Sequence, residues 1–221
     1  VVNATVGCYA GEDEVLGCLP VVEEIYRSLP MADFITYAPP IGLADYRKAA
    51  IDETFEAYRP EGYIDAVATA GGTGAIHIAI ANYSEIGDDV LASDWRWGIY
   101  GSLCQEIGRR LTTFALLDES GAFNIESFSS AVADVLRKQD SLLIILNTPA
   151  NNPTGFALSD QDWAEVLQVC RFHEKQGKRI SILVDIAYIA YAGEKNEVRT
   201  FMKQFSNLPP HLFVMVAFSM S

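Results

Sequence analysis

The sequence of 221 residues is short of positive charge. It has 16 lysines and arginines against 29 aspartates and glutamates, which gives a formal net charge of −13 at pH 7. Because nucleic-acid binding requires a basic face, this balance argues against a nucleic-acid partner. The surplus of acidic residues is instead typical of a protein that stays soluble through its net charge.

Cysteine and histidine are also scarce. The four cysteines, Cys8, Cys18, Cys104 and Cys170, show no C-x-x-C spacing, so they indicate neither a disulfide framework nor a zinc site. The three histidines are scattered along the chain, and we expect no metal site. A reduced, cytoplasmic compartment fits this use of cysteine best.

Long apolar runs are missing as well. No run approaches the roughly 18 apolar residues that a membrane-spanning helix needs, so we expect no membrane span. The N-terminal stretch "VVNATVGCYA" has no basic region in front of an apolar one, and it does not resemble a signal peptide.

From residue 63 onward the chain alternates between strand-like and helix-like segments. This alternation predicts an α/β fold, in which a mostly parallel sheet lies between two layers of helices. Residues 1 to 60 differ, with helical segments set among glycine- and proline-rich loops, and predict a separate N-terminal arm before a main domain of residues 61–221. The predicted strands are 63–72, 88–94, 110–117, 141–149, 179–185 and 211–221, and the predicted helices between them are 73–84, 98–108, 124–139 and 159–177.

Glycines and polar side chains follow the predicted strands. In sheets of this type, ligands bind beyond the carboxyl ends of the strands, so we expect one shared site there. The residues concerned are Gly71 to Gly74, Trp95 to Gly98, Asn147 to Gly155, Asp185 to Tyr188, and Ser219 to Ser221.

The stretch "AGGTGA", residues 70–75, joins the first predicted strand to a helix. Backbone N–H groups at a helix N-terminus form an anion site, which phosphate commonly occupies. The stretch is neither a Walker A motif nor G-x-G-x-x-G. A tight turn made for packing explains the same residues equally well.

The stretch "NTPANNPTG", residues 147–155, follows a buried strand and combines asparagines with two prolines. Proline restricts the residue before it, and the Asn152–Pro153 bond is a candidate for the cis form. An asparagine held in this way can direct its amide at a ligand oxygen. The alternative is an ordinary turn before a helix capped at Ser159.

A carboxylate closes the apolar strand in "LVDIAYIAYAG", residues 183–193. Burying the charge of Asp185 is costly unless a positive group meets it. By itself, the stretch is compatible with a buried salt bridge, a helix cap or a metal ligand.

Taken together, these motifs resemble the fold-type I pyridoxal-phosphate enzymes, and among them the class I aminotransferases of the aspartate and aromatic group. The resemblance is carried by GGTGA, a tryptophan in the next loop, N-N-P-T-G, D-x-A-Y and a final S-x-S. The stretch "VNATVGCYAG" is similar to that group's N-terminal substrate loop, N-x-x-V-G-x-Y. The stretch "YAPPIGLADYR" is similar to its Y-x-x-x-x-G-x-x-x-[FY] segment. The resemblance covers nearly the whole chain. It makes residues 61–221 the cofactor-binding large domain and leaves the family's C-terminal small domain outside the chain.

The resemblance implies pyridoxal 5'-phosphate as the cofactor and assigns roles around its ring. Asp185 would pair with the protonated ring nitrogen, which favours the charged form of that nitrogen. Tyr188 and Asn152 would hydrogen-bond the phenolic oxygen of the ring. Trp97 would stack on the ring face, and it is preferred to Trp95 because its distance of eleven residues to Gly108 matches the family.

The same resemblance assigns positions to the phosphate and the substrate. Tyr37 would reach the phosphate of the neighbouring subunit's cofactor, which implies a homodimer with shared sites. The phosphate would be held by Gly71, Gly72, Thr73 and Ser219, and the substrate would be contacted by Gly7, Trp97 and Asn152.

The family's central lysine follows S-x-S directly and bonds the cofactor covalently. The sequence ends at Ser221, so we expect that lysine to be the next residue of a longer protein. Lys178, Lys195 and Lys203 lie outside the motif and receive no such role. No catalytic residue is therefore expected within the chain itself.

The implied activity is transamination between an amino acid of aspartate or aromatic type and a 2-oxo acid such as 2-oxoglutarate. Another reaction on the same cofactor, such as the elimination catalysed by a C–S lyase, is an alternative, because the ring-holding residues are shared. A second alternative is an aminotransferase-like sensor domain of a transcription regulator, which would require a basic helix-turn-helix domain upstream.

Overall fold

The computed structural model describes residues 17–219. The chain divides into two compact units, Val1–Pro39 and Pro40–Ser221. The division predicted near residue 60 stays a prediction. Among the described residues, no helix is both long enough and apolar enough to cross a bilayer.

The smaller unit contains α1 (Pro20–Ser28) and α2 (Met31–Ile35). Proline at the first position of α1 suits a helix start, because its missing N–H would have no partner there in any case. Neither helix buries a residue within the described part of the chain. Tyr37 follows α2 with 90% of its surface exposed.

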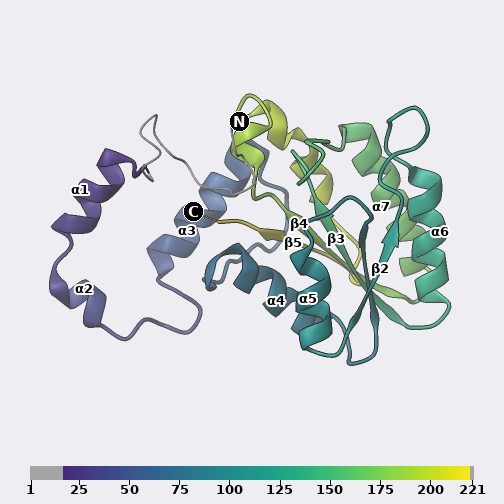
Figure 1. Ribbon diagram of the computed structural model, residues 1–221, viewed down its shortest axis with the longest axis horizontal. Coiled ribbons are helices and arrows are strands. Elements are labelled where there is room, and N and C mark those ends of the chain that lie inside the picture. Colours follow the sequence, from purple (N-terminus) through teal and green to yellow (C-terminus); the bar gives the residue numbers. More distant parts are fainter. Residues whose placement is uncertain (1–16, 220–221) are drawn as a thin grey trace, which may run out of the picture. The chain divides into compact units, whose positions relative to one another are not determined.

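The larger unit is built on a five-stranded sheet in the order β2-β1-β3-β4-β5 (Figure 1). Every neighbouring pair of strands is parallel, which confirms the predicted α/β class. The strands are β1 (Asp89–Ser93), β2 (Arg110–Phe114), β3 (Ser141–Asn147), β4 (Arg179–Asp185) and β5 (Leu212–Ala217).

Helices cover both faces of this sheet, which confirms the three layers (Figure 1). One face packs against α4 (Gly71–Tyr83) and α5 (Ile99–Glu106), and the other packs against α6 (Ile125–Leu136) and α7 (Asp160–Glu174). The remaining helices of this unit are α3 (Ala44–Phe55) and the 3-10 helices η1 (Glu56–Tyr58), η2 (Ile189–Tyr191) and η3 (Glu197–Phe205).

The central strand β3 shows why the sequence forms a buried parallel sheet. Leu142, Ile144 and Leu146 point into the core under α6 and α7. Leu143 and Ile145 point into the core under α4 and α5, because successive side chains alternate between the two faces. Each buried side chain contributes about 1.5–3 kcal/mol, so the continuous apolar run stabilises both layers.

The limits of α7 also follow from the sequence. Ser159 caps its N-terminus by accepting from the N–H of Asp162, whose carboxylate accepts from the N–H of Ser159 in return. After the last turn, Gly177 adopts a φ of +86°, a conformation that favours glycine. The predicted cap and the predicted stop are both confirmed.

The strand predicted at 63–72 is wrong. Residues 63–69 form no strand, and α4 already begins at Gly71. The period-2 pattern that prompted the prediction is present, since Ile64 and Ala66 are partly buried between exposed neighbours. No described segment pairs with this stretch as a ladder, and a strand requires such a partner.

A buried arginine anchors α3 to η3. Arg199 is 4% exposed and donates to the carbonyl oxygens of Thr54 and Lys195 at 3.1 and 2.6 Å. Its guanidinium also lies 3.9 Å from a carboxylate oxygen of Glu53. Because Thr54 is buried, the arginine supplies its carbonyl oxygen with a donor that solvent cannot.

Arg199→Met should lower the free energy of unfolding by about 2–4 kcal/mol, because two carbonyl oxygens lose their charged donor. Urea denaturation measures this change. The control is Arg137→Met, whose side chain is 69% exposed in an ion pair with Asp134, and which should stay within about 0.5 kcal/mol of the unmodified protein. Equal losses in the two variants would contradict the anchoring role.

Candidate functional site

Asp185 ends β4 at the carboxyl edge of the sheet and is 6% exposed. One carboxylate oxygen accepts from the hydroxyl of Tyr100 at 2.5 Å, and the other accepts from the N–H of Ala187 at 3.1 Å. None of the ion pairs found among the described residues includes Asp185. The carboxylate is therefore buried and hydrogen-bonded, with no cation from the described chain beside it.

This environment changes the acidity of Asp185. Burial raises its pKa above the usual value of 3.8, and the hydrogen bonds from Tyr100 and Ala187 oppose that rise. A buried carboxylate gains most from a positive partner, since such a partner offsets the cost of removing its charge from water. The site is thus suited to a ligand that brings a cation to Asp185.

Tyr100 was missed in the sequence. Its side chain lies on α5 with 1% of its surface exposed, and burial and the charge of Asp185 raise its pKa. Its ring meets the ring of Trp97 edge to face, with centroids 5.7 Å apart. The spacing of three residues places both on one side of a helical turn, which was the available signal. The contact with Asp185 spans 85 residues and has no local signature.

Residues 147–155, called the asparagine loop below, pack directly against the end of β4. Asn147 donates its side-chain amide to the carbonyl oxygen of Asp185 at 3.0 Å and accepts from the backbone N–H of Asn152 at 2.6 Å. Asn151 is buried and donates to the carbonyl oxygen of Trp95 at 3.2 Å. The bonds Thr148–Pro149 and Asn152–Pro153 are both cis.

These contacts separate the three asparagines by role. The side chains of Asn147 and Asn151 are used to hold the loop. The side-chain amide of Asn152 forms no hydrogen bond with another described residue, and Asn152 is only partly buried. Of the three, Asn152 is therefore the one whose amide remains available to a ligand.

The N-terminus of α4 lies beside the end of β5. Gly71 has a φ of +67°, and the preceding Ala70 has no side chain that could cap the helix. A Cβ on Gly72 would lie 3.6 Å from the Cβ of Ser219, so the first turn of α4 and this serine are neighbours. Uncapped N–H groups at the positive end of a helix, next to a serine, are suited to an anion.

The other predicted site residues differ in where they lie: some belong to the same unit as Asp185, one belongs to the smaller unit, and two lie outside the described residues. Trp97 is half-buried behind the contact with Tyr100, and Thr73 and Tyr188 are exposed on the same unit. Tyr37 belongs to the smaller unit, so its place relative to Asp185 stays a prediction. Gly7 and Ser221 lie outside the described residues.

The lysines that were excluded in the sequence are engaged elsewhere. Lys178 pairs with Asp140 at 2.7 Å, close to where β3 begins and thus at the opposite edge from Asp185. Lys195 pairs with Glu53 and Glu56, and Lys203 lies 6.0 Å from the ring centre of Tyr58. Within residues 17–219, no group of three or more potential metal ligands gathers.

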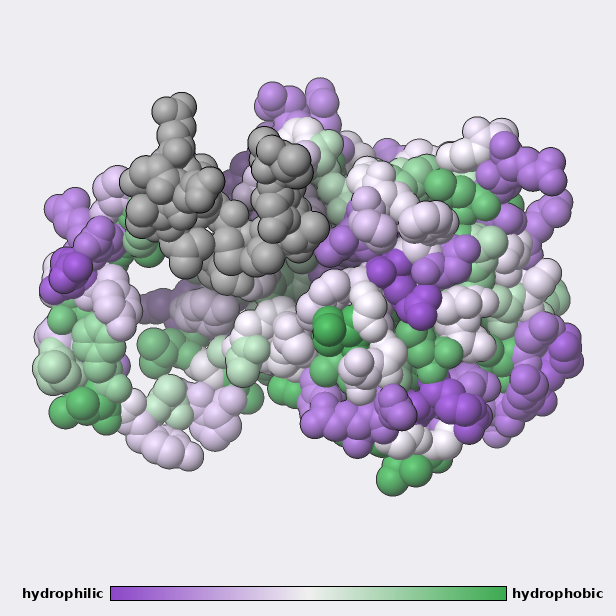
Figure 2. Space-filling view, in the orientation of Figure 1, coloured by the Kyte–Doolittle hydropathy of each residue, from purple (hydrophilic) through white to green (hydrophobic). Residues whose placement is uncertain are grey.

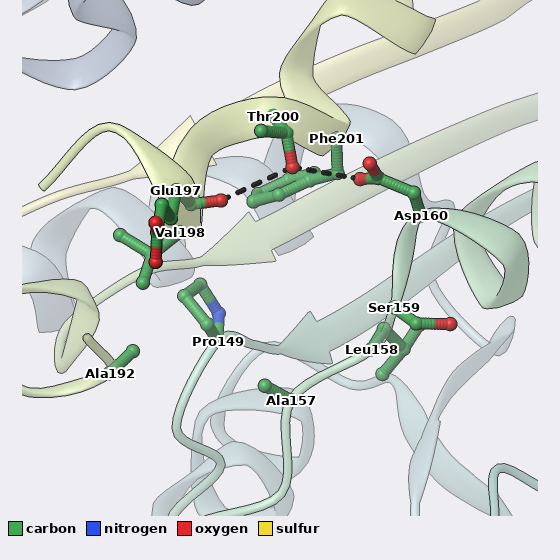
Figure 3. A pocket seen from close by; sticks show the side chains of 10 residues that line it. All are labelled: Pro149, Ala157, Leu158, Ser159, Asp160, Ala192, Glu197, Val198, Thr200 and Phe201. Atoms are coloured by element: carbon green, nitrogen blue, oxygen red, sulfur yellow. Dashed lines mark hydrogen bonds between the residues drawn. The ribbon is translucent and has the colours of Figure 1, made fainter. Parts of the chain in front are cut away.

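A cavity of about 250 Å³ lies between the asparagine loop and η3 (Figure 3). Pro149 of that loop lines it, but none of the residues assigned to the cofactor or the substrate does. Thr200 bridges Asp160 and the carbonyl oxygen of Glu197 on its wall (Figure 3). Because the carboxylates of Asp160 and Glu197 would repel a phosphorylated ligand, this cavity does not suit the anion that α4 favours. Hydrophilic side chains dominate much of the visible face of this unit (Figure 2).

Comparisons with known proteins bear on the family and the fold of the chain. The family described as "Aminotransferase class I and II" matches residues 1–221. Mitochondrial aspartate aminotransferase of Gallus gallus is 25% identical over 214 residues, which are 92% of this chain and 48% of the relative. Aromatic-amino-acid aminotransferase of Pseudomonas aeruginosa is 28% identical over 152 residues, which are 68% of this chain and 36% of the relative.

Solved structures extend the likeness to the fold. An aminotransferase from Anaerococcus prevotii is 41% identical with a TM-score of 0.95, and the match covers 100% of this chain and 54% of that one. An aromatic-amino-acid aminotransferase from Burkholderia pseudomallei, covalently bound to pyridoxal phosphate, is 23% identical with a TM-score of 0.76, over 98% and 53% of the two chains. The chain thus spans about half the length of these structures.

The raised pKa of Asp185 predicts a specific pH dependence of stability in the absence of ligand. A carboxyl group whose pKa is higher in the folded than in the unfolded state stabilises the fold at low pH, and this contribution is lost as pH rises through the folded pKa. Between about pH 4 and about pH 8, the protein should therefore lose stability relative to Asp185→Asn, whose amide cannot ionise. Thermal unfolding of both proteins across this range measures the difference, and a difference that does not change with pH would contradict the assigned burial cost.

Proposed function

The chain belongs to the class I and II aminotransferase family, and from this premise we propose that it forms the cofactor-binding part of a pyridoxal-phosphate-dependent aminotransferase. The proposed reaction moves an amino group between an amino acid of aspartate or aromatic type and a 2-oxo acid such as 2-oxoglutarate. The observation that carries this proposal is the buried carboxylate of Asp185, which has hydrogen-bond donors but no cationic partner within residues 17–219.

The residues present fit pyridoxal 5'-phosphate at both of its charged ends. The ring nitrogen can carry a positive charge, and Asp185 offers it a buried carboxylate. The phosphate is an anion, which is suited to the uncapped N-terminus of α4, with Gly71, Gly72 and Thr73, and to the neighbouring Ser219. The site therefore supplies a negative group and a positive helix end at the edge of a single sheet.

Other residues would hold the plane and the phenolic oxygen of the ring. Trp97 would lie against the ring face, with Tyr100 supporting it from behind. The side-chain amide of Asn152, which bonds no other described residue, and the hydroxyl of the exposed Tyr188 would donate to the phenolic oxygen. In a homodimer, Tyr37 of one subunit would reach the phosphate held by the other, and Gly7 would lie against the substrate.

When bound, the cofactor supplies a ring that accepts the electron pair left behind when the α-proton of the amino acid departs. Asp185 would keep the ring nitrogen charged, which would strengthen that acceptance. The lysine proposed to follow Ser221 would bond the cofactor and move the proton. Within the chain, the described residues thus bind and orient the cofactor.

A panel of amino donors tests the proposed function on the full-length protein. With pyridoxal 5'-phosphate and 2-oxoglutarate supplied, aspartate or an aromatic amino acid should shift the cofactor's absorbance and yield glutamate together with a 2-oxo acid. Release of ammonia without glutamate would identify an elimination reaction instead. No absorbance shift with any amino acid would count against an enzyme of this kind.

Asp185→Ala should weaken pyridoxal 5'-phosphate binding by about 100-fold or more, since breaking a buried ion pair leaves the ring nitrogen without its partner. Turnover should fall below detection. Asp140→Ala is the matched control, because Asp140 is a surface carboxylate at the opposite edge of the sheet and its loss should leave binding unchanged. Equilibrium dialysis of the cofactor measures both, and unchanged affinity in the Asp185 variant would refute the assigned role.

A further inference from the structure

Packing alone does not explain the hydroxyl of Tyr100. Its ring lies in the apolar core between α4, α5 and the sheet, where Leu103 and Cys104 are its buried neighbours on the same helix. A phenylalanine would fill the same volume without burying a polar atom. The hydroxyl instead donates to Asp185, so its role is to hydrogen-bond that carboxylate.

The hydroxyl of Tyr100 is a neutral donor, so it leaves the negative charge of Asp185 uncompensated. A lysine or arginine in the place of Tyr100 would pair with Asp185 and compete with a cationic ligand. A phenol favours the ionised carboxylate through one hydrogen bond and leaves its full negative charge for the ligand. The titratable groups that act on Tyr100 are Asp185 and Tyr188, and neither of them brings a positive charge.

The same side chain reaches a second predicted contact. The ring of Tyr100 stands at 89° to the ring of Trp97, so it fixes the plane of the tryptophan by an edge-to-face contact. One residue of α5 therefore touches both the carboxylate proposed for the ring nitrogen and the indole proposed for the ring face.

We propose that Tyr100 is a positioning residue of the cofactor site, which keeps Asp185 ionised and oriented through its hydroxyl while its ring holds Trp97. The proposal rests on the proposed function, because it assumes that a cationic ring nitrogen is what Asp185 receives. Tyr100 itself needs no contact with the cofactor or the substrate.

Tyr100→Phe tests the hydroxyl alone, since the ring and its contact with Trp97 remain. The first measurement needs no cofactor and uses thermal unfolding across pH in two backgrounds. Between about pH 4 and about pH 8, the variant's unfolding constant should rise roughly 10- to 100-fold relative to unmodified protein, because the ionised carboxylate loses its donor. In the Asp185→Asn background, the same substitution should show no such pH dependence. A merely structural tyrosine would give the same effect at every pH in both backgrounds.

The second measurement is the affinity of the full-length protein for pyridoxal 5'-phosphate across the same pH range. Tyr100→Phe should weaken binding roughly 10- to 100-fold, and the fall in binding at low pH should begin at a higher pH than in the unmodified protein. Tyr83→Phe is the matched control, because Tyr83 lies at the far end of α4, about 20 Å from its first residue, and stacks on Phe213.

The two measurements separate failure of this proposal from failure of the function. If the unmodified protein binds the cofactor and Tyr100→Phe matches it in affinity and pH profile, the role of Tyr100 is overturned and the function stands. If the unmodified protein binds no cofactor, the proposed function and the positioning role both fall.

Discussion

A single buried carboxylate determines how the rest of this site is organised. Asp185 ends the interior strand β4, and its carboxylate accepts hydrogen bonds from the hydroxyl of Tyr100 on α5 and from the backbone N–H of Ala187 in the loop that follows. Burial disfavours its charge, and no described ion pair compensates. Without a ligand, such a buried carboxylate reduces the stability of the fold. A protein retains a costly group of this kind where a bound ligand supplies the opposite charge.

The parallel sheet is what allows short segments to meet around this carboxylate. The register pairs Asn147 with Asp185 at the ends of adjacent strands, and the asparagine amide ties the two backbones together. On the other side, β5 ends where Ser219 approaches the glycines of α4. The carboxylate of Asp185 and the positive N-terminus of α4 therefore lie at one edge of the sheet, while helices on both faces shield the strands from water.

Much of this arrangement could be predicted from the sequence, because it follows from local patterns. The continuous apolar run of β3, the cap at Ser159 and the aspartate at the end of β4 are encoded within a few residues, and the structure has each of them. The strand predicted at 63–72 failed because strand formation depends on a partner elsewhere, which alternation alone does not reveal. Tyr100 and the structural role of Asn151 were missed for a similar reason, since their partners lie 85 and 56 residues away.

The central claim is that Asp185 is buried in order to hold a positively charged ring nitrogen. The most direct measurement is the ¹⁵N chemical shift of pyridoxal 5'-phosphate, labelled at its ring nitrogen and bound to the full-length protein. A shift typical of a protonated pyridine is expected in the unmodified protein at neutral pH, and a shift toward the unprotonated value is expected in Asp185→Asn. An unprotonated nitrogen in the unmodified protein would contradict the claim.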